Sequence, residues 1–144
     1  MPLDSTMNSL VLIDTGVVLR YIIGDVPATQ RIKSLTTQFG LLYICPQVLY
    51  EFWTVATRPQ AQNGFGLTPQ QAGQFVYQIV DQFALLPDPP DLWRRWVELC
   101  KKHGVSGRDA HDARMVAWMD AYGISYLCTL NPDDFKRYTH IQIV

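Results

Sequence analysis

Short apolar runs alternate along the chain with longer segments in which apolar residues recur at helical spacing. Runs this short predict strands, whereas the longer periodic segments predict helices. The predicted strands are 10–13, 41–45, 84–86, 125–130 and 141–144. The predicted helices are 17–23, 27–39, 47–57, 68–83, 88–103 and 108–122.

Strands that alternate with helices favour an α/β domain with a mainly parallel sheet of about five strands. The strand interiors are continuous apolar runs, as expected when helices cover both faces of a sheet. Residues 1–8 are polar and irregular and are expected to form a short arm, whereas 9–144 are expected to form a single domain. Sheets of this kind bind ligands beyond the carboxyl ends of their strands, where the strand order switches.

Composition excludes several classes of protein. The 144 residues have a formal charge of −1, which excludes a strongly basic nucleic-acid coat protein but leaves nucleic-acid binding open. Cys45, Cys100 and Cys128 form no CxxC pair, so neither a disulfide framework nor a zinc site is expected, and reduced thiols favour a cytoplasmic protein. No signal peptide and no apolar run near ~18–20 residues is found, so no membrane partner is expected.

Polar residues follow two of the predicted strands. Asp14 comes directly after the run 10–13, and Asn131, Asp133 and Asp134 follow the run 125–130. If the two strands are parallel, both groups lie at the same edge of the sheet. Asp14 has two interpretations at this point: it caps the helix that follows, or it binds a cation that offsets the cost of its burial.

Two further acids lie inside predicted helices. Glu51 has mostly apolar neighbours, and Asp112 shares a helix face with Val116 that is expected to meet the sheet. Asp112 is alternatively an acid favoured by the dipole at a helix N-terminus. Asp109 follows Ser106 by three residues, as in a capping box, so it is expected to cap the same helix, with a supporting role at the site as the alternative.

Oxygen ligands from separate elements, without a cluster of Cys or His, suit a hard cation. Mg²⁺ or Mn²⁺ fits such a set best. Ions of this kind hold a phosphate group and activate a water molecule for in-line attack. The acids together therefore predict hydrolysis at phosphate.

Four segments of the chain carry a more specific pattern: LIDTGVVLRYI, VLYEFWTVATRP, HDARMVAWMDAYGISYLCTLNPDDF and the closing IQIV. In this order they resemble the PIN-domain family of metal-dependent ribonucleases, and most closely the VapC-type toxins of bacterial toxin–antitoxin pairs. The resemblance spans nearly all of 10–144. It implies a PIN-like three-layer α/β/α fold, an RNA substrate, homodimers and a partner antitoxin.

The resemblance also assigns roles to individual residues. Asp14, Glu51 and Asp112 match the catalytic acids that bind the metal, and Asn131 matches the fourth catalytic position. Thr15 and Thr129 match hydroxyl residues that help to position the acids or the phosphate.

The chain departs from the family pattern at two positions. Many relatives carry Asp where this chain has Asn131, so Asp133 or Asp134 is left to supply the missing carboxylate through a water. Gly16 stands where Asn or Ser is usual. One metal site is therefore expected, and whether a second ion binds is open.

Basic residues near the predicted site in the sequence are candidates for contacts with RNA phosphates, or else ordinary solvated charges. They are Arg20, Arg58, Arg108, Arg114, Lys136 and Arg137.

Two other functions remain open at this stage. A PIN-like module that binds RNA or a partner without cutting would explain Asn131. A dimeric aspartic protease would use Asp14-Thr15-Gly16 in a shared carboxylate pair, but it requires an almost all-β chain.

Overall fold

The computed structural model describes residues 9–144, and the predicted arm 1–8 lies outside the described residues. Its sheet has five strands in the order β3-β2-β1-β4-β5, and every neighbouring pair is parallel. The strands are β1 (Val11–Ile13), β2 (Tyr43–Ile44), β3 (Ala84–Leu85), β4 (Tyr126–Cys128) and β5 (Gln142–Ile143). The predicted parallel sheet is confirmed, although its strands are shorter than the apolar runs.

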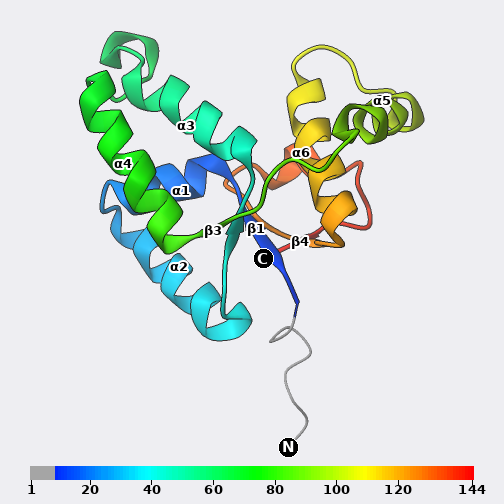
Figure 1. The fold of residues 1–144 in the computed structure, drawn as a ribbon, viewed down its shortest axis with the longest axis horizontal. Coiled ribbons are helices and arrows are strands. Elements are labelled where there is room, and N and C mark those ends of the chain that lie inside the picture. Colours follow the sequence, from blue (N-terminus) through cyan, green and yellow to red (C-terminus); the bar gives the residue numbers. More distant parts are fainter. Residues whose placement is uncertain (1–8) are drawn as a thin grey trace, which may run out of the picture.

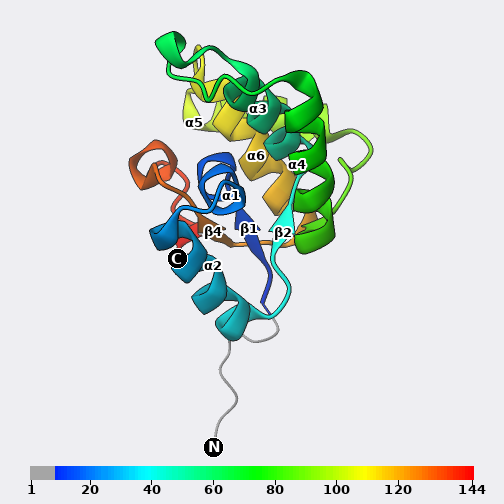
Figure 2. The same ribbon diagram turned by 90° about the vertical axis from the view of Figure 1, so that its left-hand side faces the viewer.

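Helices cover both faces of this sheet, as Figures 1 and 2 show. Helices α1 to α4 pack together on one side, whereas α5 and α6 pack against each other on the other side. The helices are α1 (Thr15–Ile22), α2 (Val26–Phe39), α3 (Pro46–Thr57), α4 (Pro69–Gln82), α5 (Leu92–His103) and α6 (Asp109–Tyr122), with short 3₁₀ turns η1 (Gln60–Gln62) and η2 (Pro132–Phe135). The arrangement is the predicted three-layer α/β/α fold.

Four of the six helices begin within one residue of the predicted start, and two begin further from it. Helix α1 begins at Thr15 because the Asp14 carboxylate accepts a hydrogen bond from the Thr15 backbone N–H at 2.7 Å. Helix α5 begins only at Leu92, because Pro89 and Pro90 disfavour helical backbone in the residues before them.

The predicted cap of α6 is wrong. Arg108 occupies the N-cap position and makes no side-chain capping bond. The carboxylate of Asp109 instead accepts a hydrogen bond from Arg137 at 3.2 Å, within an ion pair between α6 and the segment after η2. A tertiary contact has displaced the local motif formed with Ser106.

The two central strands fix the position of the site. Strands β1 and β4 are fully buried over most of their length, and Ile13 pairs with Cys128. The chain leaves β1 toward β2 and β3, and later returns to β4 on the opposite side of β1. The carboxyl ends of β1 and β4 therefore form the crevice at which open α/β sheets bind ligands. No helix within residues 9–144 is both long and apolar enough to cross a bilayer.

Candidate active site

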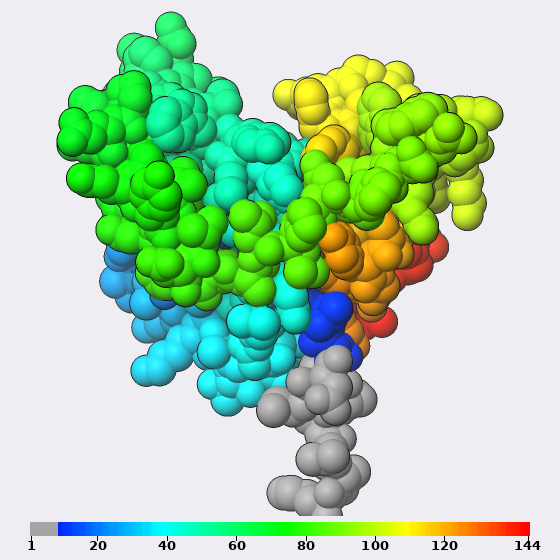
Figure 3. Space-filling model, viewed as in Figure 1, coloured from blue at the N-terminus to red at the C-terminus, as the bar shows by residue number. Residues whose placement is uncertain are grey.

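A cavity of about 520 Å³ lies at the carboxyl ends of β1 and β4. Figure 3 shows the surface hollowed between the lobe that contains α3 and α4 and the lobe that contains α5 and α6. The cavity brings together four predicted catalytic residues from four separate elements: Asp14, Glu51, Asp112 and Asn131. Its other lining residues are Thr15, Gly16, Leu19, Arg20, Thr54, Val55, Asn63, Phe65 and Leu130.

Asp14 is held through both oxygens of its carboxylate. Oδ1 accepts from the Thr15 backbone N–H, and Oδ2 accepts from the Thr129 hydroxyl, each at 2.7 Å. Burial nevertheless raises the pKa of Asp14, because it outweighs these two hydrogen bonds, and the charges of Glu51 and Asp134 raise it further. Asp14 thus caps α1 and lines the cavity at once, so its two interpretations are compatible.

Glu51 is held in the same way by α1 and by its own helix. Its Oε2 accepts from the Thr15 hydroxyl at 2.7 Å, and its Oε1 accepts from the Gln47 side-chain amide at 2.8 Å. Thr15 therefore contacts both acids, with its backbone toward Asp14 and its side chain toward Glu51. Gln47 was not predicted as a site residue, although its spacing of four from Glu51 places both on one helix face.

Asp112 differs from these two acids. Within the described part of the chain, no group donates a hydrogen bond to its half-buried carboxylate. Burial is the largest cause that raises the pKa of Asp112 to about 7, followed by the charges of Asp14, Asp134, Glu51 and Asp109. The acids of the site therefore lie close enough to repel one another.

The segment after β4 brings an amide and a carboxylate to the site. Asn131 lines the cavity, and its backbone N–H donates to the Thr129 hydroxyl at 3.1 Å. The charge of Asp134 raises the pKa of two acids in the cavity, whereas exposed Asp133 forms an ion pair with Lys136 at 2.9 Å. Of the two acids that the sequence left open, Asp134 is the one that adds charge to the site.

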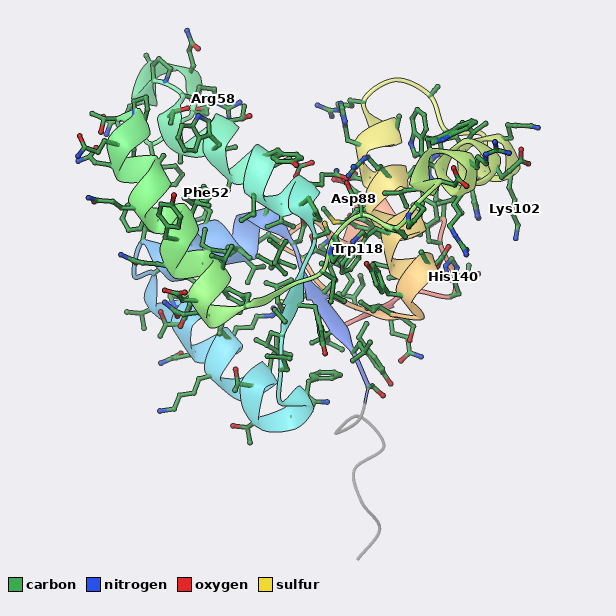
Figure 4. All side chains as sticks on the ribbon, viewed as in Figure 1. Phe52, Arg58, Asp88, Lys102, Trp118 and His140 are labelled. Atoms are coloured by element: carbon green, nitrogen blue, oxygen red, sulfur yellow. The ribbon has the colours of Figure 1, made fainter. Side chains whose placement is uncertain are left out.

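The candidate RNA-binding residues are more dispersed than the acids. Arg20 lines the cavity. Arg58 lies at the outer end of α3, where its guanidinium donates to the Asn63 carbonyl at 3.5 Å (Figure 4). Arg108 and Lys136 are exposed and do not line the cavity. Of these four residues, Arg20 is the one placed to contact a phosphate beside the acids, and Arg58, Arg108 and Lys136 stay predictions for contacts with a longer RNA.

The donor set suits a hard cation in its chemistry, since it consists of carboxylate and amide oxygens. Within residues 9–144, however, no three Asp, Glu, His or Cys side chains form a group ready to hold an ion. Asp14 and Glu51 also use their oxygens to accept hydrogen bonds from Thr15, Thr129 and Gln47. Each of these oxygens keeps a second lone pair, so a cation can bind beside the donors, directly or through water.

The sequence matches the PIN domain over residues 11–141. The chain belongs to the PIN-domain family. Solved structures with a similar fold include VapBC2 from Rickettsia felis bound to a DNA fragment from its promoter, with 14% identity, a TM-score of 0.71, and coverage of 94% of this chain and 97% of that chain. DNA-bound VapBC from Salmonella typhimurium has 18% identity, a TM-score of 0.68, and coverage of 94% and 97%.

A third similar structure is VapC20 from Mycobacterium tuberculosis, a toxin that cleaves the sarcin-ricin loop. It has 16% identity and a TM-score of 0.57, and the match covers 81% of this PIN domain and 86% of that chain. At such identities the likeness shows the fold alone. A search of curated protein sequences finds no match.

The PIN fold overturns the alternative of an aspartic protease. That alternative requires an almost all-β chain, whereas six helices surround the parallel sheet of this PIN domain. Asp14-Thr15-Gly16 opens helix α1. A Cβ atom at position 16 would lie 3.2 Å from Leu130 Cδ1, so a larger residue there would require the exposed Leu130 side chain to shift slightly.

Proposed function

We propose that this PIN domain is a metal-dependent endoribonuclease that hydrolyses RNA phosphodiester bonds, as the toxin of a toxin–antitoxin pair. The observation that carries the proposal is the concentration of negative charge at the switch point of the sheet. Asp14, Asp134 and Glu51 all help to raise the pKa of Asp112. Charge gathered at this cost is typical of a site that works with a cation bound.

Asp14, Glu51 and Asp112 are the residues that would hold Mg²⁺ or Mn²⁺. When bound, the ion supplies Lewis acidity to a phosphate and acidifies a water molecule. The remaining roles belong to the chain itself. Thr15 and Thr129 fix the orientation of Asp14, which follows β1, and Thr15 also that of Glu51 on α3. Arg20 at the cavity wall attracts the phosphate backbone of RNA.

The proposed partners follow from the structural relatives. Similar chains have been solved in VapBC complexes bound to DNA, so a cognate antitoxin is proposed for this protein too. The homodimer that the family resemblance implies is proposed with it. RNA as substrate implies work in the cytoplasm. The free thiols of Cys45, Cys100 and Cys128 agree with a reducing compartment.

The test is RNA cleavage by the purified chain, freed of any antitoxin. A mixture of ribosomal and transfer RNA is incubated with MnCl₂ or with EDTA, and new 5′ ends are mapped by sequencing. Cleavage at discrete sites with MnCl₂ alone is expected, and both Asp14→Asn and Asp112→Asn should abolish it. Equal cleavage by these variants would identify a contaminating nuclease and contradict the proposal.

A module that binds RNA without cutting it is the second candidate. It is favoured by the uncharged Asn131 and by the lack of a preformed metal-holding group within residues 9–144. The same experiment separates the two functions. RNA that binds the wild-type chain but stays intact with MnCl₂ would favour the binding module.

A further inference from the structure

A buried amide connects Glu51 to the opposite side of the cavity. Gln47, on the first turns of α3, is only 6% exposed. Its Nε2 donates to Glu51 Oε1 at 2.8 Å and to the His111 carbonyl on α6 at 2.7 Å. Both hydrogens of this amide group are therefore used, and one of them holds the proposed catalytic acid.

The oxygen of the same amide is held by an arginine. Arg114 on α6 donates from Nη1 to Gln47 Oε1 at 3.1 Å and from Nη2 to Asp88 Oδ2 at 2.6 Å. Asp88, labelled in Figure 4, lies on the linker between β3 and α5. The result is a continuous series of side chains, Asp88–Arg114–Gln47–Glu51, which we name the polar relay.

Arg114 decides which way the Gln47 amide points. A guanidinium has only hydrogen-bond donors, so it can bond only to the oxygen of an amide and not to the nitrogen. The nitrogen end must then face Glu51 and His111. Arg114 was a candidate either for a contact with RNA phosphates or for an ordinary solvated charge, but its ion pair with Asp88 and its bond to Gln47 occupy it within the protein.

The relay also keeps a positive charge at a distance from the acids. A direct Arg–Glu pair would satisfy Glu51 but would neutralise the charge that a bound cation requires. The neutral amide of Gln47 stands between Arg114 and Glu51 and supplies a hydrogen bond without adding a charge. Asp88 balances Arg114 on its far side.

We propose that Gln47 and Arg114 are positioning residues for Glu51, with Asp88 as the anchor of the relay. The effect expected on the rate of RNA cleavage rests on the proposed ribonuclease function. Partners that orient a metal-binding side chain typically contribute about 10–100-fold to activity or metal affinity. Loss of the relay should therefore affect the chemical step while the fold is retained.

The kinetic test compares Arg114→Met with a matched control, Arg94→Met. Arg94 is an arginine on α5 whose ion pair with Asp91 is mostly exposed to solvent. With an RNA oligonucleotide that the wild type cleaves, Arg114→Met should lower kcat by about 10–100-fold and change KM by less than about twofold. Gln47→Met should lower kcat by a similar factor. Asp88→Asn should lower kcat by a smaller factor, and Asp91→Asn is the matched control for this variant.

A second readout does not depend on activity. Hydrogen exchange of the Gln47 side-chain amide, followed by NMR, should be slow in the wild type and in Arg94→Met, and at least about tenfold faster in Arg114→Met. This variant changes a partly exposed side chain, so it tests the relay even if Gln47→Met fails to fold. Melting temperatures of all variants establish that the folded protein is being compared.

The outcomes distinguish the two proposals. Slow amide exchange in Arg114→Met, or a kcat within about twofold of Arg94→Met, would overturn the relay. A wild type that cleaves no RNA would overturn the ribonuclease instead, and amide exchange would then still decide whether Arg114 orients Gln47.

Discussion

The two walls of the cavity treat their acids in opposite ways. On the wall formed by β1, α1 and α3, Asp14 and Glu51 each accept two hydrogen bonds, at 2.7–2.8 Å. On the wall formed by α6 and η2, none of the described residues donates to Asp112, and the charge of Asp134 lies beside it. The first wall holds its carboxylates in place with hydrogen bonds, whereas the carboxylates of the second wall repel each other.

This difference indicates a division of work. Hydrogen bonds from Thr15, Thr129 and Gln47 define where the oxygens of the first wall lie before any ligand arrives. The repulsion at Asp112 is relieved only by a proton or a cation, because no protein group offsets it. The first wall therefore fixes the positions of the Asp14 and Glu51 oxygens, whereas the repulsion at Asp112 on the second wall depends on whether a proton or a cation is bound.

The largest effect is expected when a donor of the fixed wall is removed. Thr129→Val keeps the shape of a side chain that is 4% exposed, but it leaves Asp14 Oδ2 unpaired. We expect about 10–100-fold slower RNA cleavage and a loss of about 1–3 kcal/mol in the free energy of unfolding. Steady-state kinetics and urea denaturation measure the two quantities. Thr37→Val, on the exposed face of α2, is the control, and equal behaviour of both variants would contradict a fixed wall.

A stability effect of opposite sign is expected at Asp112. Folding raises the pKa of Asp112 from 3.8 to about 7, so the folded chain binds more protons than the unfolded chain between these values. This acid therefore destabilises the protein most above pH 7, and the destabilisation is relieved as the pH falls toward 4. Asp112→Asn should raise the melting temperature without metal at pH 8 by about 3–6 °C, which corresponds to about 1–2 kcal/mol after screening by solvent.

Calorimetry at two pH values checks this prediction. The difference between Asp112→Asn and the wild type should shrink by more than half at pH 5. Asp81→Asn removes the same charge from an exposed position on α4 and should change the melting temperature little at either pH. A melting temperature that falls in Asp112→Asn at pH 8 would instead assign Asp112 a stabilising role at the N-terminus of α6.

A smaller effect separates two neighbouring acids of η2. Asp134 adds charge to the cavity, whereas Asp133 is paired with Lys136. Asp134→Asn should weaken Mn²⁺ binding by about threefold to tenfold, and the difference should decrease at high ionic strength. Asp133→Asn should leave the affinity within about twofold. Isothermal titration of the two variants decides the point, and equal losses would show that neither acid is specific to the site.

The smallest effect is expected for Asn131→Asp. The substitution adds a carboxylate to the cavity lining, but at an exposed position where water screens it. Mn²⁺ affinity should increase by about two- to threefold in the same titration. Unchanged affinity would show that Asn131 lies outside the surroundings of the ion.

It could be predicted from the sequence that Asp14 and Asn131 lie close together, because the geometry of a parallel sheet requires it. Asp14 and Asn131 each follow a strand, and parallel neighbours carry their carboxyl ends to one edge. The acids on α3 and α6 required more, since their placement depends on how the helices pack. Glu51 and Asp112 could be singled out as acids on apolar helix faces, but only the resemblance to the PIN-domain family assigned them to one site with Asp14.

The contacts that hold the acids were less accessible to sequence reasoning. Gln47 had a usable signal, because it precedes Glu51 by four residues on one helix. The pairing of Arg114 with Asp88 had none, since it depends on how α6 lies against the linker after β3. Asp109 shows the reverse error, because a local capping motif was outweighed by Arg137, 28 residues later in the chain.

The hydrogen bond between Thr129 and Asp14 has a consequence for protein synthesis. It joins residues separated by 115 positions, and it requires β4 to be paired with β1. A chain made from its N-terminus contains Asp14 and Glu51 long before it contains the partner strand. The hydrogen bond that holds Asp14 Oδ2 therefore forms only after almost all of the chain has been translated, so the site proposed for RNA cleavage is completed late in synthesis.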